Sequence, residues 1–130
     1  MAQPERVQRM KVSPVTLREL SAAVQRFCEK RNWDRFHSPK DLSIAIATEA
    51  SELMELFRFK TDEENRTLLK TIGGREQVAD ELADVLYFVL RFGQMHRIDV
   101  AKALTAKLKK NARKYPIEKS RNSNKKYDEL

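Results

Sequence analysis

Apolar residues recur every three or four positions in four stretches of this chain, which cover about residues 14–31, 39–59, 75–96 and 100–115. This spacing places them on one face of a helix. In the first stretch, Leu17, Leu20 and Val24 follow Ser13-Pro14, a pair that commonly begins a helix. No stretch shows the alternation of apolar and polar residues that marks a half-buried strand. The pattern therefore predicts an all-α fold built on four helices.

The segments between these stretches are polar and carry helix boundaries. Ser38-Pro39 begins the second helix, and Asp99 caps the fourth, which ends before a proline. Residues 60–74 are expected to form a loop that ends in two glycines, with room for a helical turn near 66–69. The third helix is apolar on nearly all sides over residues 82–92, so we expect it to be central and the most buried.

Two pairs of acidic residues lie inside the apolar parts of the second and third helices: Glu49 with Glu52, and Glu81 with Asp84. Members of each pair are three positions apart, so they share a helix face. Buried carboxylates are costly, and like charges one turn apart repel, so the arrangement needs a compensating charge. No basic residue is equally placed, and oxygen ligands suit Mg²⁺. The pattern favours a magnesium site between two antiparallel helices; the alternative is that the acids face solvent.

A nest of four carboxylates could hold two or more magnesium ions, bind phosphate oxygens and supply a metal-activated water. A di-iron bundle also uses acids on helices, but it needs Glu-x-x-His pairs. Neither His37 nor His96 has that spacing from a glutamate of the two pairs. Metal-assisted phosphate chemistry is therefore the better interpretation.

The length of 130 residues predicts one domain, at residues 13–116, between a flexible arm at 1–12 and a basic tail at 117–130. The composition of the tail is typical of disorder. The net charge is +7, and residues 99–130 carry ten Lys/Arg against four Asp/Glu. Such a basic end could contact nucleic acid or a triphosphate. A small helical nucleic-acid-binding protein is thus an alternative, although no binding motif supports it.

The single cysteine, Cys28, lies among the apolar positions of the first helix, so we expect a core thiol and no disulfide framework. No apolar run is long enough to span a bilayer, and the charged N-terminal residues have no apolar signal core. A cytoplasmic protein without membrane contact is the expectation.

Several motifs of this chain resemble those of the MazG-like, all-α nucleoside triphosphate pyrophosphohydrolases, and in particular the dCTP pyrophosphatase branch. The resemblance covers nearly the whole chain from about Leu17. It rests on the acid pairs within EASE and ELAD and on four further motifs: RNWDRFH at 31–37, ELFRFK at 55–60, NARKYP at 111–116 and KKYDEL at 125–130.

The resemblance implies that a nucleoside triphosphate and water give a nucleoside monophosphate and pyrophosphate, with attack at the α-phosphorus. It implies that Glu49, Glu52, Glu81 and Asp84 bind Mg²⁺, and that Glu49 or Glu52 orients the attacking water. It places Trp33, His37 and Phe59 around the nucleobase and Lys107 and Asn111 near the phosphates. Its further substrate-binding positions are Phe88, Lys114 and Tyr115. On structural grounds alone, Trp33 would be a core residue and Asn111 a helix cap.

The chain departs from the branch at two positions. Phe59 stands where a Trp is usual, and Phe88 stands where a Tyr is usual, with Tyr87 beside it. Both changes keep an aromatic ring and remove a hydrogen-bond donor, so dATP, dUTP or a modified nucleotide remain alternative substrates. The resemblance also implies a homo-oligomer, a dimer of dimers, which would cover the apolar third helix.

Overall fold

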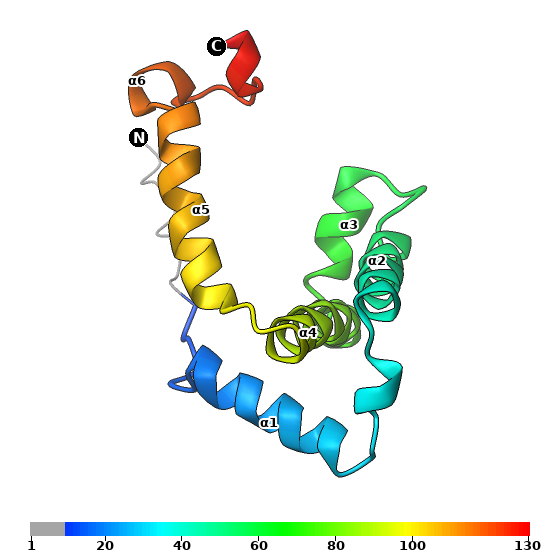
Figure 1. Ribbon diagram of the computed structural model, residues 1–130. Coiled ribbons are helices and arrows are strands. Elements are labelled where there is room, and N and C mark those ends of the chain that lie inside the picture. Colours follow the sequence, from blue (N-terminus) through cyan, green and yellow to red (C-terminus); the bar gives the residue numbers. More distant parts are fainter. Residues whose placement is uncertain (1–9) are drawn as a thin grey trace.

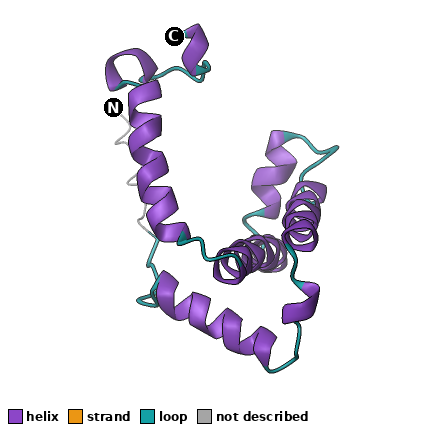
Figure 2. Cartoon of the chain, in the orientation of Figure 1, coloured by secondary structure: helices purple, strands orange, loops and turns teal. Residues whose placement is uncertain are grey.

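The computed structural model of this protein describes residues 10–130, and within them every regular element is a helix (Figure 2). This confirms the predicted all-α fold. The helical elements of this part of the chain are α1 (Leu17–Glu29), η1 (Asp34–Phe36), α2 (Pro39–Glu55), α3 (Asp62–Leu68), α4 (Ile72–Met95), α5 (Val100–Lys114), α6 (Ile117–Ser120) and η2 (Tyr127–Glu129). Most of the predicted arm, residues 1–9, lies outside the described residues.

Helix α1 begins at Leu17, three residues later than the start predicted from Ser13-Pro14. The reason is a capping box. The hydroxyl of Thr16 accepts from the backbone N–H of Glu19 at 3.2 Å, and the Glu19 carboxylate accepts from the N–H of Thr16 at 2.8 Å. Among the described residues, the Ser13 hydroxyl accepts only from the N–H of Val15, at 3.3 Å. Two reciprocal bonds satisfy two donors at the helix start, whereas Ser13 offers one weak contact.

The predicted loop at 60–74 is largely helical, which corrects the sequence prediction. It contains all of α3, and α4 begins at Ile72, so both glycines lie inside the first turn of α4. Thr71 caps α4 by accepting from the N–H of Gly74 at 3.0 Å. A Cβ at Gly74 would lie 2.1 Å from the carbonyl oxygen of Leu68, so this glycine is needed for close packing.

Helix α4 is the centre of the fold. It packs along α2 over much of its length and also contacts α1 and α5. Figure 1 shows α1 and α2 beside α4, whereas α5 leaves the end of α4 and extends away from the other helices. The residues on α5 are therefore carried away from α2 in the single chain.

The apolar surface of α4 is only partly covered. Leu90 is buried, but Leu82 is 54% exposed and Leu86 is 42% exposed. The prediction that α4 is central is thus confirmed, whereas the prediction that it is the most buried helix holds only toward its C-terminal end. Leu104 and Leu108 on α5 are also exposed. A single chain leaves much apolar surface in contact with water.

The C-terminal residues carry more structure than their composition predicts. Residues 117–130 contain α6 and η2, and the ring of Tyr127 meets that of Tyr115 edge-to-face at 6.1 Å. The ammonium group of Lys114 lies 4.8 Å from the same ring. These contacts join the tail to the end of α5 and explain why a polar segment adopts defined turns. None of the helices in residues 10–130 is long and apolar enough to cross a membrane.

Candidate active site

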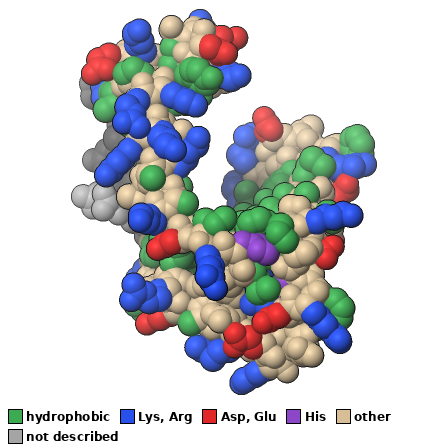
Figure 3. All heavy atoms as spheres, in the orientation of Figure 1, with side chains coloured by type: hydrophobic (Ala, Val, Ile, Leu, Met, Phe, Trp, Pro, Cys, Tyr) green, Lys and Arg blue, Asp and Glu red, His purple; other side chains and the backbone are tan. Residues whose placement is uncertain are grey.

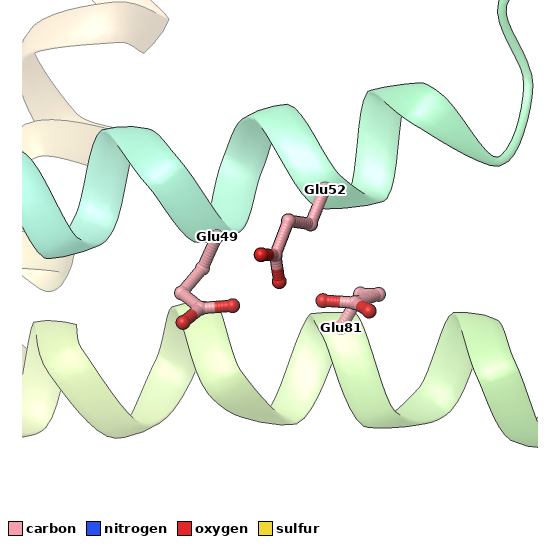
Figure 4. A group of neighbouring side chains, drawn as sticks. All are labelled: Glu49, Glu52 and Glu81. Carbon is pink, nitrogen blue, oxygen red and sulfur yellow. The ribbon is translucent and has the colours of Figure 1, made fainter.

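Three glutamates from two helices converge between α2 and α4. Figure 4 shows Glu49 and Glu52 projecting from α2 toward Glu81 on α4. One carboxylate oxygen from each residue lies within 4.8 Å of the other two. The spacing of three residues along α2 directs both of its acids to the face that packs against α4. We call Glu49, Glu52 and Glu81 the acid cluster.

The acid cluster is electrostatically strained as it stands. Burial, followed by a hydrogen bond and charge repulsion from Glu52, raises the pKa of Glu49 to about 7. Burial first, and then the Glu52 carboxylate, also raises the pKa of Glu81. One buried oxygen of Glu49 and one of Glu81 have no hydrogen-bond partner within the described residues. Unpaired buried carboxylate oxygens are what a hard cation would bind, so the residues fit a divalent metal.

Asp84, the predicted fourth ligand, lies beside the acid cluster without belonging to the group of three. Its negative charge contributes to the raised pKa values of both Glu49 and Glu81. It also lines a neighbouring cleft. Its role as a metal ligand therefore stays a prediction.

An apolar cleft of about 470 Å³ lies next to the acid cluster and is lined by Ala23, Val24, Phe27, Trp33, Asp84 and Tyr87. We call it the aromatic cleft. Phe27 meets Trp33 edge-to-face at 5.7 Å and Tyr87 at 6.1 Å, so three aromatic rings form its wall. Because Asp84 lines the cleft and its charge acts on Glu49 and Glu81, the cleft lies next to the acid cluster.

Four residues of the cleft lining were not selected in the sequence analysis: Ala23, Val24, Phe27 and Tyr87. Of these four, only Tyr87 carries a hydroxyl. Tyr87 lies one helical turn after Asp84, so the sequence spacing indicates that the two residues share a face of the helix, and this could have identified it. Its hydroxyl oxygen lies 3.0 Å from the Sγ of the buried Cys28, and burial is the main cause of its raised pKa. The predicted Phe88 instead packs edge-to-face on the Tyr87 ring at 4.8 Å and does not line the cleft.

His37 lies behind Trp33 and outside the lining of the aromatic cleft. Its ring centroid is 6.4 Å from that of Trp33, and its Nδ1 accepts a 2.7 Å hydrogen bond from Nε of Arg91. Burial, followed by the charge of Arg91, lowers the pKa of His37. The structure thus brings His37 to the site as a neighbour of the Trp33 ring.

The remaining predicted substrate contacts are not brought to the cleft within one chain. Phe59 is 92% exposed, has a left-handed φ of 61°, and lies under the Arg58 guanidinium at 4.4 Å. The other four lie along α5 or at its end, and α5 extends away from α2 (Figure 1): Lys107, Asn111, Lys114 and Tyr115. Figure 3 shows that Lys and Arg side chains cover much of this arm.

The chain is all-α, and it brings acids from two adjacent helices together beside an aromatic cleft. The chain belongs to the MazG-like family, whose model matches residues 44–130. It is 35% identical to dCTP pyrophosphatase 1 of Homo sapiens over 115 residues, which cover 88% of this chain and 68% of that protein. It is 34% identical to dCTP pyrophosphatase 1 of Bos taurus over 118 residues, which cover 91% and 70%.

The fold is similar to a crystal structure of a pyrophosphatase from Archaeoglobus fulgidus DSM 4304. The TM-score is 0.72 and the sequence identity 30%, and the match covers 83% of this chain and 99% of that chain. The family and the fold suggested by the sequence motifs are therefore confirmed.

Proposed function

We propose that this protein is a nucleotide pyrophosphohydrolase that converts dCTP and water to dCMP and pyrophosphate. The observation that carries the proposal is the continuity of the acid cluster with the aromatic cleft through Asp84. Such a site holds a charged phosphate group at one end and a flat base at the other. The dCTP pyrophosphatases of Homo sapiens and Bos taurus, which are about a third identical to this chain over the aligned residues, support this substrate.

The acid cluster would hold Mg²⁺, with Asp84 as a further ligand beside it. A bound magnesium ion neutralises the charge of phosphate oxygens and makes a coordinated water more acidic. Glu49, Glu52 and Glu81 supply only oxygen atoms, which matches the preference of this ion. In the reaction, water adds to the α-phosphorus, and the bond to the bridging oxygen breaks. That oxygen leaves with pyrophosphate, and Glu49 or Glu52 accepts a proton from the water.

The aromatic cleft would hold the base. Trp33 offers an indole face next to Phe27, and stacking of a base on an aromatic ring contributes about 1–3 kcal/mol. The Tyr87 hydroxyl lies against the Sγ of Cys28 at 3.0 Å, so its ring is the part of Tyr87 that would meet the base. This wall selects a flat base by shape. Related nucleotides such as dATP, dUTP or a modified dNTP are therefore the competitors to be compared with dCTP.

The protein would work as a homo-oligomer, in line with a dimer of dimers. The exposed leucines of α4 and α5 would be covered by other copies. An oligomer would also bring the basic residues of α5 near the acids of another copy, which a single chain does not do (Figure 1). Lys107, Asn111 and Lys114 would then contact the triphosphate across a subunit boundary, with Tyr115 at the end of the same helix. The lysines would act as point charges.

The test is a panel of NTPs and dNTPs with Mg²⁺ in water enriched in ¹⁸O, with products analysed by mass spectrometry. We expect dCTP to give the highest kcat/KM, with the label in dCMP and none in pyrophosphate. Label in pyrophosphate, or release of dCDP and inorganic phosphate, would contradict attack at the α-phosphorus. A higher kcat/KM for dATP or dUTP would reassign the base while leaving the reaction intact.

A further inference from the structure

Arg91 is a buried charged residue on α4, with only 1% of its surface exposed. A guanidinium remains protonated at any ordinary pH, so its burial requires hydrogen-bond acceptors. Three are present. Its Nε donates to Nδ1 of His37 at 2.7 Å, its Nη1 donates to Oε1 of Gln94 at 2.9 Å, and its Nη2 donates to Oδ1 of Asp34. We call this set of four residues the arginine cluster.

The arginine cluster joins the three elements that form the aromatic cleft. Arg91 and Gln94 belong to α4, whereas Asp34 begins η1, the short turn that follows Trp33, and His37 caps the end of that turn. Gln94 extends the connection to α1, since its Nε2 donates to the backbone oxygen of Ser21 at 2.8 Å and to its Oγ at 3.0 Å. Arg91 itself does not line the cleft. It contacts His37 and Asp34, which lie next to the lining residue Trp33.

The hydrogen bond from Arg91 determines the protonation state of His37. The Nε–H of arginine can only donate, so Nδ1 of His37 must accept and the remaining ring proton must be on Nε2. The charged groups acting on this ring are Arg91 from α4, Asp34 from η1 and Asp41 from α2. Burial and Arg91 lower the pKa of His37, whereas the two aspartates raise it. Protonation at Nδ1 would break the bond and release the ring that packs edge-to-face on Trp33.

We propose that Arg91 is a positioning residue for the aromatic cleft, which holds His37 as the neutral Nε2–H tautomer and thereby fixes the Trp33 ring. The kinetic consequences of this positioning role rest on the proposed hydrolysis of dCTP. The tautomer of His37 can be tested independently of that function. Arg91 does not belong to the acid cluster, so its loss should weaken binding of the base and leave the chemical step unchanged.

The first experiment examines the full chain by NMR without substrate. The protein has two histidines, and a His96→Gln variant assigns the second set of signals. Long-range ¹H–¹⁵N spectra should show His37 at pH 7 as the neutral tautomer with the proton on Nε2, titrating below the ordinary value of 6.5. A His37 that is charged at pH 7, or that carries its proton on Nδ1, would overturn the proposal whatever the enzyme hydrolyses.

The second experiment separates positioning from simple stabilisation. Arg91→Met should raise the KM for dCTP about tenfold and leave kcat within about twofold, because the displaced Trp33 loses part of its stacking. Arg35→Met is the matched control, since Arg35 is exposed, belongs to the same turn and lies over the Phe36 ring at 4.8 Å. An Arg91→Met protein with a lower melting temperature and an unchanged KM would show that Arg91 only stabilises the fold.

A third comparison remains available if Arg91→Met does not fold. His37→Asn retains an acceptor for Arg91, whereas His37→Leu removes it. The Leu variant should raise KM more than the Asn variant at pH 7. The KM of the wild type should rise as the pH falls through the pKa of His37, whereas the KM of His37→Asn should not show this rise. Both proteins bind the same substrate, so titration of the substrate affects them equally. Equal KM values in the two variants, with parallel pH profiles for Asn and wild type, would overturn the positioning role.

Discussion

Helix α4 takes part in two charged clusters that differ in one respect. Glu81 belongs to the acid cluster, in which three carboxylates face one another and two buried oxygens have no partner in the described part of the chain. Arg91 belongs to the arginine cluster, in which each nitrogen of the guanidinium donates to a named acceptor. When the chain itself supplies the hydrogen-bond partners of a charged group, that group can hold the neighbouring residues in place. Buried carboxylate oxygens without such partners are where binding of a cation would be expected.

The largest effect that would test this contrast is the loss of one acid. Glu52→Gln should lower kcat/KM by about 10²–10⁴-fold, because it removes a proposed metal ligand and a candidate base. The variant should fold, and its melting temperature without metal should be equal to or above that of the wild type, since a repulsive charge is gone. Steady-state kinetics and thermal unfolding measure both quantities.

Glu55→Gln is the control for Glu52→Gln. Glu55 lies one turn further along α2, pairs with Arg58 at 2.6 Å and is exposed, so its loss should change neither quantity appreciably. Full activity in Glu52→Gln would remove the acid cluster from the reaction.

A magnesium titration tests whether the unsatisfied cluster is prepared for a cation. A ligand that binds only the folded state stabilises it by about 2.7 kcal/mol at one hundred times its dissociation constant. We expect the melting temperature of the wild type to rise with millimolar Mg²⁺ and that of Glu52→Gln to rise much less. Na⁺ at matched ionic strength controls for screening. A melting temperature that does not change with Mg²⁺ would mean that the acid cluster does not bind this cation.

The Trp33 ring tests the connection between the two clusters. Trp33→Ala should raise the KM for dCTP roughly ten- to a hundred-fold, from the range for base stacking, and should leave magnesium stabilisation intact. Phe36→Ala is the control, because Phe36 is exposed in the same turn and absent from the cleft. A large loss of stability with an unchanged KM would make Trp33 a core residue only.

The acid cluster could be predicted from the sequence because its signal is local. Glu49 and Glu52 are one helical turn apart, and the same pattern recurs at Glu81 and Asp84, so two short stretches contain the chemistry. The all-α fold was equally accessible, since apolar periodicity and caps such as Asp99 are local features.

The arginine cluster could not be predicted in this way. Asp34 and Arg91 are 57 residues apart in sequence, and no local pattern connects them. The start of α1 was misplaced because the Thr16–Glu19 capping box competes with Ser13-Pro14, and both are plausible local signals. The order in the tail depends on contact between Tyr115 and Tyr127, which composition does not reveal. Nor does sequence show whether α5 meets the acids of its own chain or of another.

The smallest expected effects concern the pH dependence of stability without metal. Here the two clusters change the stability in opposite directions. Glu49 has an ordinary pKa of 4.5 and a folded pKa of about 7, so between these values the folded protein holds more protons than the unfolded chain. Stability from this group therefore falls as the pH rises from 4.5 to about 7. For His37 the folded pKa lies below 6.5, so stability is lost as the pH falls below 6.5.

Melting temperatures measured with EDTA from pH 4.5 to 8 should therefore contain two opposite slopes, which single variants separate. Glu49→Gln should reduce the decline toward neutral pH to the part that Glu81, whose pKa is also raised, contributes, and it should retain the loss on acidification from His37. His37→Asn should do the reverse. Mg²⁺ should abolish the Glu49 slope, because ligation requires the ionised carboxylate, and should leave the His37 slope unchanged, because the arginine cluster contains no free ligand. If Mg²⁺ altered both slopes equally, the two clusters would form one electrostatic unit, and the distinction between a satisfied and an unsatisfied charge on α4 would fail.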